Sequence, residues 1–146
     1  MTTPLPVYVA EAAEMQAFRI SPADTNYFVI LHDDRIPGFT SVAVIEIFEP
    51  GGRTPPNSHK AAYEFFYVLA GTGRATCGDS VVDLARGSAM LVPPGGVHVI
   101  ENTGPAKLYT LTVMMPDEAF AALIRSGTSV ALDAEDIALL SAARPA

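Results

Sequence analysis

The chain has few of the residues that mark secreted, membrane-spanning or disulfide-stabilised proteins. Its single cysteine, Cys77, cannot form an intrachain disulfide, and a reducing environment suits such a chain. No apolar run approaches the roughly 20 residues of a transmembrane helix, and the N-terminal residues lack the basic start and apolar core of a signal peptide. We therefore expect a cytoplasmic protein.

Basic side chains are also scarce. Lys and Arg number 9 against 16 Asp and Glu, which gives a net charge of −7 and an isoelectric point near 4.7. No Lys/Arg cluster occurs anywhere along the chain. Nucleic acid and anionic membrane surfaces are consequently poor partners, and we expect neither.

Several familiar catalytic patterns are missing as well. The sequence has no Ser-His-Asp arrangement with supporting context, no phosphate-binding glycine loop and no Cys-x-x-Cys pair. What it has instead is a high apolar content, 49%, over 146 residues. This composition is typical of one well-buried domain and favours further burial of apolar surface in an oligomer.

Short apolar segments divided by Gly and Pro fill most of the chain. This pattern is typical of an antiparallel sandwich or barrel, so the sequence predicts an all-β domain. We expect strands at 5–9, 16–20, 27–31, 41–48, 65–69, 74–77, 81–84, 89–92 and 107–113, with another carrying His98. Residues 119–125 and 133–143 have the composition and the terminal signals of two short helices.

Polar residues interrupt this apolar pattern in two stretches. The first runs from Gly51 to Gly71 and contains Asn57, His59 and Glu64 just before an apolar strand. Asn57 and His59 are two residues apart, so on a strand both would point to the same face. A histidine and a carboxylate aimed into an apolar strand pair are costly to bury unless something compensates them, and a metal ion would do so.

The second stretch, residues 87–102, has a similar design. An apolar strand enters a Pro-Pro-Gly-Gly turn, and the chain then returns in a strand that carries His98. Two imidazoles and one carboxylate that converge on an apolar interior are suitable ligands for Zn, Fe, Mn, Ni or Co. The sequence therefore predicts one divalent ion per chain, held by His59, Glu64 and His98.

Together the two stretches resemble the paired signature motifs of the cupin superfamily, over roughly residues 41–115. The first motif is matched at Gly51, His59, Glu64 and Gly71, and the second at Gly87, Pro93, Gly95, His98 and Asn102. The resemblance implies a small double-sheet jelly-roll barrel, which we place at about 5–115. The change of composition after Met115 predicts a helical extension at about 116–146, within the same single domain. It also implies a homodimer paired through its N-terminal strands.

Asn57 departs from this family pattern, because it occupies the place of the usual first metal histidine. Its amide oxygen is a neutral hard donor that suits Mn or Fe better than a soft site. Three roles stay open for Asn57: direct ligation, holding a metal-bound water, or hydrogen bonding alone.

The residues around the predicted ion are less strongly indicated. Five apolar or aromatic side chains are candidates to line the mouth of the barrel: Phe48, Phe66, Met90, Ile100 and Tyr109. Their facing depends on strand register to within one residue. Arg53 and Lys60 flank the first motif, where they either steer an anionic substrate or are simply solvated.

The chemistry therefore points to a metal-dependent enzyme that acts on a small organic molecule, with oxidation or isomerisation favoured. Glu64 is the candidate catalytic residue, either as a ligand or as a base. The alternative is a non-catalytic module that binds a small ligand such as a sugar or a phenolic acid. The cupin fold does not choose between these functions.

Overall fold

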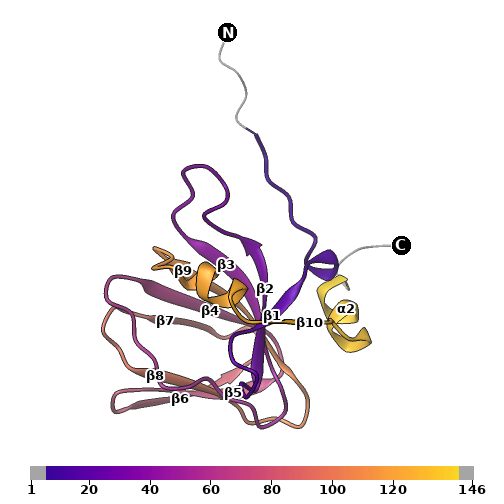
Figure 1. The fold of residues 1–146 in the computed structure, drawn as a ribbon. Coiled ribbons are helices and arrows are strands. Elements are labelled where there is room, and N and C mark those ends of the chain that lie inside the picture. Colours follow the sequence, from indigo (N-terminus) through magenta and orange to yellow (C-terminus); the bar gives the residue numbers. More distant parts are fainter. Residues whose placement is uncertain (1–5, 142–146) are drawn as a thin grey trace.

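Two antiparallel β-sheets form the body of the protein in a computed structural model that describes residues 6–141 (Figure 1). The larger sheet has the order β10-β1-β2-β3-β9-β4-β7 and the smaller has the order β6-β5-β8. The strands of the larger sheet are β1 (Ala17–Arg19), β2 (Asn26–His32), β3 (Val42–Phe48), β4 (Tyr63–Ala70), β7 (Ala89–Val92), β9 (Leu108–Met115) and β10 (Thr128–Val130). The smaller sheet contains β5 (Thr72–Cys77), β6 (Ser80–Ala85) and β8 (His98–Asn102). The predicted all-β jelly-roll class is confirmed, although the two sheets do not close into a continuous barrel.

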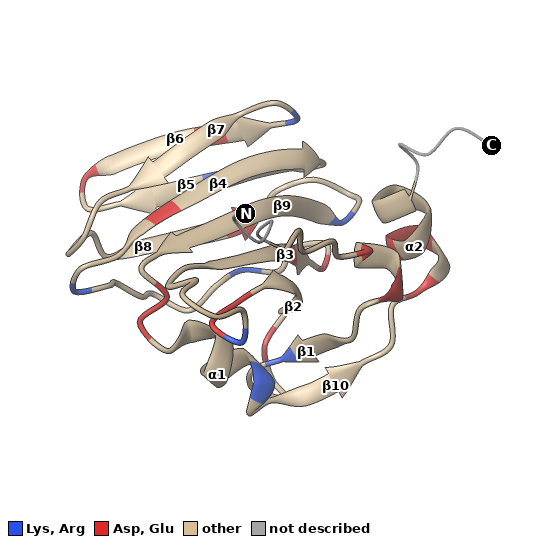
Figure 2. Ribbon diagram, turned by 90° about the horizontal axis from the view of Figure 1, so that it is seen from above, with Lys and Arg blue, Asp and Glu red and all other residues tan. Residues whose placement is uncertain are grey.

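Three short helical segments complete the fold: η1 (Ala12–Glu14), α1 (Phe120–Arg125) and α2 (Ala134–Ser141). The two predicted C-terminal helices are thus present. Among residues 6–141, no helix is long and apolar enough to cross a membrane. Acidic segments are prominent at α2, whereas the few Lys and Arg positions are scattered along the ribbon (Figure 2).

The N-terminal edge strand expected at 5–9 is wrong for residues 6–9, which belong to no strand, while residue 5 lies outside the described range. The edge position is taken instead by β10, which pairs antiparallel with β1 and was not predicted. With three residues, Thr-Ser-Val, β10 is too short for the alternation that identifies a strand from sequence.

Alternating side chains of β3 explain how the interior is organised. Val42 and Val44 join one apolar cluster, with Phe28, Met114 and Ile124 of α1. Phe48, at the other end of the same face, joins a second cluster. This second cluster also contains Phe66, Val68, Ala75, Leu84, Val92, Ile100 and Leu108. Between Val44 and Phe48 on the inward face stands a carboxylic acid, Glu46, which is 3% exposed.

The outer face of the larger sheet is covered in part by α2, through a buried polar cluster. Asp136 of α2 accepts hydrogen bonds from the hydroxyl groups of Tyr27 and Tyr109, both at 2.7 Å. The ammonium group of Lys107 lies 3.1 Å from Asp136 and 2.5 Å from Asp133. Burial would lower the pKa of Lys107, but its bonds to Asp133, Tyr27 and Asp136 raise it overall. These contacts fix α2 on the sheet.

Asn102, the last residue of the second motif, braces the turn that follows β8. Its side-chain amide donates to the carbonyl oxygens of Phe48, Glu49 and Ala106 at 3.2, 3.0 and 2.8 Å. Its amide oxygen accepts from the backbone N–H of Gly104 at 3.0 Å. These four hydrogen bonds give Asn102 a structural role.

Replacing Asn102 with alanine should lower the free energy of unfolding by about 2 kcal/mol, because buried carbonyl groups lose their donor. Urea unfolding followed by circular dichroism measures this change. Thr103→Ala is the matched control, since Thr103 is exposed and should change stability by less than about 0.5 kcal/mol. Equal effects of the two substitutions would contradict the bracing role.

Candidate metal centre

Three potential metal ligands meet at one point between the two sheets. The Nε2 atom of His59 and the Nε2 atom of His98 each lie 2.9 Å from the same carboxylate oxygen, Oε2 of Glu64. The ligand atoms of the three residues all lie within 4.8 Å of one another. The structure therefore brings together the three residues that the sequence singled out as metal ligands.

Different elements supply these side chains. Glu64 lies near the start of β4 in the larger sheet, and His98 begins β8 in the smaller sheet. His59 lies in the loop before β4, where its carbonyl oxygen accepts a hydrogen bond of 2.7 Å from the N–H of Gly95. Because Gly95 has a φ of 83°, the turn of the second motif adopts a conformation that favours glycine and can bind the loop of the first.

The orientation of His98 suits metal ligation. Its Nδ1 atom lies 2.9 Å from the carbonyl oxygen of Gly96, which can only accept, so Nδ1 carries the proton. In the neutral ring the lone pair is then on Nε2, the atom that faces Glu64. This is the tautomer that a metal site requires, and it is set by the backbone of the Pro-Pro-Gly-Gly turn.

Electrostatics couple the three groups. Burial would raise the pKa of Glu64, but the hydrogen bonds to His59 and His98 and the positive charge of these rings lower it overall. Burial would likewise lower the pKa of His98, but its bonds to Glu64 and to the Gly96 carbonyl raise it overall. The two histidines therefore favour the ionised form of the Glu64 carboxylate, which is the form that ligates a cation.

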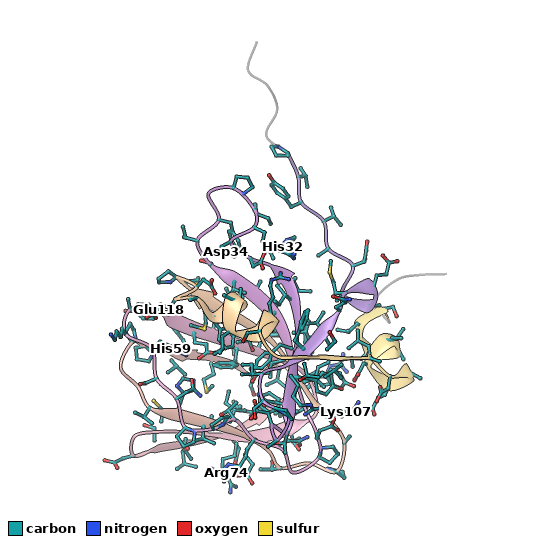
Figure 3. The ribbon with its side chains drawn as sticks, viewed as in Figure 1. His32, Asp34, His59, Arg74, Lys107 and Glu118 are labelled. Carbon is teal, nitrogen blue, oxygen red and sulfur yellow. The ribbon has the colours of Figure 1, made fainter. Side chains whose placement is uncertain are left out.

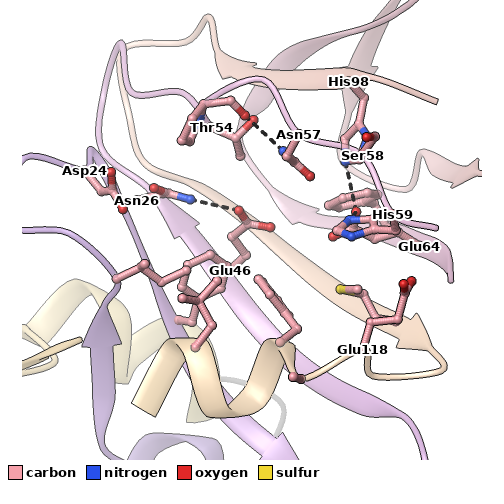
Figure 4. A pocket seen from close by; sticks show the side chains of 18 residues that line it. Asp24, Asn26, Glu46, Thr54, Asn57, Ser58, His59, Glu64, His98 and Glu118 are labelled. Atoms are coloured by element: carbon pink, nitrogen blue, oxygen red, sulfur yellow. Dashed lines mark hydrogen bonds and ion pairs between the residues drawn. The ribbon is translucent and has the colours of Figure 1, made fainter. Parts of the chain in front are cut away.

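A pocket of about 360 Å³ opens beside this trio (Figure 4). Its apolar walls come largely from Ile20, Phe28, Phe66, Phe120 and Leu123. The ring of Phe120 meets that of Phe28 edge-on at 5.5 Å, so α1 forms part of the wall. The volume is that of a site for a small molecule.

The acidic residue before α1 ties this wall to the first motif. The carboxylate of Glu118 accepts hydrogen bonds from the backbone N–H groups of Lys60, Ala61 and Ala62, at 3.2, 3.3 and 2.7 Å. Glu118 and His59 lie on the same side of the molecule, away from Lys107 beside α2 (Figure 3). Glu118 thus fixes the loop that carries His59.

Asn57 lines the pocket but makes a hydrogen bond of its own. Its side-chain N–H donates to the carbonyl oxygen of Pro55 at 3.0 Å, while its backbone exchanges two hydrogen bonds with that of His98. It lies in a loop and makes an isolated bridge rather than being part of a strand. Direct ligation of the ion by Asn57 stays a prediction.

The pocket lining differs from the prediction in four of five residues. Phe66 lines the pocket, whereas Phe48 and Ile100 are fully buried in the second apolar cluster, with Met90 packed against it. The prediction for Tyr109 is wrong, because this residue lies on the outer face, where it bonds Asp136. In β9 the side chains of Leu108 and Thr110 point inward. The prediction for Tyr109 was therefore displaced by one residue along the strand, which turns the side chain to the opposite face.

Among the pocket residues that were missed at the sequence level are Asn26 and Glu46. The side-chain N–H of Asn26 donates to Oε1 of Glu46 at 3.0 Å. Burial, followed by the charge of Glu64, raises the pKa of Glu46 to about 8. A lone acid within the apolar run of β3 was the signal that could have identified this pair, since such a group is costly to bury without a purpose.

Comparison with known proteins supports the fold. Residues 44–114 match the model of the cupin domain family. An uncharacterized protein of Methanocaldococcus jannaschii is 28% identical over 87 residues, which cover 60% of this chain and 70% of that protein. The structure of a predicted oxalate decarboxylase from Thermotoga maritima is 23% identical with a TM-score of 0.66, over 73% of this chain and 96% of that one.

A structure of an oxalate oxidase is also similar in fold, with 21% identity and a TM-score of 0.58. The match covers 67% of this chain and 54% of the oxidase. The fold and the trio define a small jelly-roll protein with a candidate metal centre between its sheets. The matched segment and the similar fold support a small cupin-superfamily domain.

Proposed function

We propose that this protein is a metal-dependent enzyme that acts on a small organic molecule, with one divalent ion per chain. The observation that carries the proposal is the convergence of two imidazole nitrogens on one carboxylate oxygen, each at 2.9 Å, beside an apolar pocket. His59, Glu64 and His98 would hold the ion, and such a donor set suits Zn, Fe, Mn or Ni.

A bound ion would supply Lewis acidity toward a ligand oxygen or, in the case of iron, reactivity with dioxygen. The contacts of Glu64 with both imidazoles support a ligand role for this carboxylate rather than that of a mobile base. The apolar walls would exclude water and hold the organic part of the substrate. We favour oxidation or isomerisation as the reaction class.

Metal analysis of the purified protein tests this proposal. We expect about one ion per chain in the natural protein and in His32→Ala, because His32 lies outside the trio. His98→Ala should lose the ion, since it removes one of three ligands. A natural chain that binds no Zn, Fe, Mn or Ni after reconstitution, or a His98→Ala variant that retains the full ion content, would contradict the proposal.

The second candidate is a binding module without turnover. The observation in its favour is Asn57, which stands where cupins usually supply an imidazole and whose amide is bonded to Pro55. A metal site with fewer protein ligands can still hold an organic ligand in place. Saturable binding without product formation, for every ligand that the metal-loaded protein binds, would favour this alternative.

A further inference from the structure

His59 is the least firmly placed of the three candidate metal ligands. Glu64 and His98 belong to strands β4 and β8, whereas His59 lies in the loop that precedes β4. Its side chain is 15% exposed, against 7% for Glu64 and 2% for His98. The position of its Nε2 atom therefore depends on how the loop is anchored, and a ligand that is poorly oriented binds a metal less tightly.

Glu118 anchors this loop on the C-terminal side of His59. The last three N–H groups before β4 are those of Lys60, Ala61 and Ala62. Oε1 of Glu118 accepts a hydrogen bond from the first of these groups, and Oε2 accepts from the other two. Desolvation would raise the pKa of Glu118, but these hydrogen bonds lower it overall. An ionised carboxylate therefore makes three charge-assisted bonds to the loop.

The turn that carries Glu118 is itself held in place. Glu118 and Ala119 have φ angles of 49° and 63°, and within residues 6–141 they are the only non-glycine residues in this left-handed conformation. Such a conformation is costly for a residue with a side chain and persists where neighbouring contacts enforce it. The N–H of Asp117 donates to the carbonyl oxygen of Thr40 at 2.8 Å, and α1 then buries Ile124 in the first apolar cluster. The turn thus presents the Glu118 carboxylate at a fixed point.

This anchor belongs to a part of the chain that follows the cupin match. The family model covers residues 44–114, whereas Glu118 precedes α1. Phe120 of α1 lines the pocket, and Figure 4 shows Glu118 at the end of the pocket where His59 and Glu64 lie. One short segment therefore forms a pocket wall and holds the loop of a candidate metal ligand.

We propose that Glu118 is a positioning residue of the metal centre, which holds the loop before β4 so that Nε2 of His59 stays on the ion. This inference rests on the proposed function, because it requires an ion at the trio. Both oxygens of Glu118 are engaged by the loop, so Glu118 acts through His59 rather than on the ion. Its replacement should lower the affinity for the ion by more than the accompanying loss of stability explains.

The zinc dissociation constant of the purified protein, measured by competition with a chelator, tests this role. Glu118→Ala removes the acceptor of all three N–H groups and should raise the dissociation constant about tenfold, the lower end of the range for groups that orient metal ligands. Glu118→Gln keeps an acceptor oxygen without the charge, and its dissociation constant should stay within about threefold of that of the natural protein.

Asp133→Ala is the control that separates affinity from stability. Asp133 caps α2 and contacts Lys107, which lies away from His59 in Figure 3. This variant should lower the melting temperature of the metal-free protein and leave the zinc dissociation constant unchanged. The melting temperature of metal-free Glu118→Ala is measured beside it, so that a loss of affinity is not mistaken for a loss of folded protein.

A double-mutant cycle then assigns the effect to His59. His59→Ala leaves Glu64 and His98 to bind zinc more weakly. Adding Glu118→Ala to this variant should change the dissociation constant by less than about twofold, because the loop no longer carries a ligand. Where His59→Ala binds zinc too weakly for measurement, the comparison of Glu118→Ala with Glu118→Gln and Asp133→Ala decides.

The outcomes separate the two proposals. A natural chain that binds none of Zn, Fe, Mn and Ni overturns the proposed function and this inference with it; a chain that binds one of the others instead of zinc is tested with that ion. The inference alone is overturned if Glu118→Ala binds the ion as tightly as the natural protein. It is also overturned if Glu118→Gln loses as much affinity as Glu118→Ala, or if Glu118→Ala has the same effect with and without His59.

Discussion

Asp136→Ala should lower the free energy of unfolding by about 3 to 5 kcal/mol, the range found when one partner of a buried ion pair is removed. Asp136 is 1% exposed and accepts hydrogen bonds from both Tyr27 and Tyr109. Without it, two buried hydroxyl groups lose their acceptor and Lys107, which is 9% exposed, loses one of its two anions. Urea unfolding at pH 7 measures the loss.

Asp133→Ala is the matched control for this prediction. Asp133 contacts the same ammonium group, but its side chain is 55% exposed. It also accepts a hydrogen bond from the N–H of Asp136 at 2.9 Å, as a residue that caps α2. We expect a loss of about 1 kcal/mol from this variant, the usual cost of a lost cap. Equal losses in the free energy of unfolding from the two variants would mean that the burial of Asp136 does not increase its contribution to stability.

Glu46→Gln should change the dependence of stability on pH. Between the ordinary carboxyl pKa of 4.5 and the value of about 8 in the folded protein, the native state holds a proton that the unfolded chain has released. The free energy of unfolding contributed by Glu46 is therefore highest below pH 4.5 and falls as the pH rises to about 8. Glutamine does not titrate, so the free energy of unfolding of the variant does not decrease with pH on account of this residue.

The stability of the variant relative to the natural protein should thus rise by about 3 to 5 kcal/mol between about pH 4 and pH 9. Both proteins are measured free of metal, because a nearby cation would itself favour the charged form of Glu46. Glu14→Gln, which removes an exposed carboxyl group, is the matched control, and an equal rise in this variant would contradict the role of burial at Glu46. A flat profile for Glu46→Gln would show that this carboxyl group is ionised in the folded state.

The trio was accessible from the sequence because local spacing fixes it. Glu64 follows His59 by five residues, and a Pro-Gly turn precedes His98, so short segments largely determine where these side chains point. The bond from His98 Nδ1 to Gly96 is equally local. Metal ligation by these residues stays a prediction, as does the homodimer.

The rest of the site depends on contacts that no local pattern contains. Asn26 meets Glu46 only because of the register in which β2 pairs with β3. Tyr109 faces Asp136 because the register between β3 and β9 turns its side chain to the outer face. A shift of one residue turns every side chain of a strand to the other face. The sequence therefore predicted which strands exist better than which of their residues line the pocket.

Glu64 and His98 come from different sheets, and this placement would couple folding to metal supply. An ion bound to both would join β4 to β8, so the sheets could not separate at this edge without releasing it. Binding that is restricted to the folded state stabilises it in proportion to the logarithm of the ion concentration, by about 2.7 kcal/mol at one hundred times the dissociation constant. The supply of metal would then set how long the protein persists, as well as what it does.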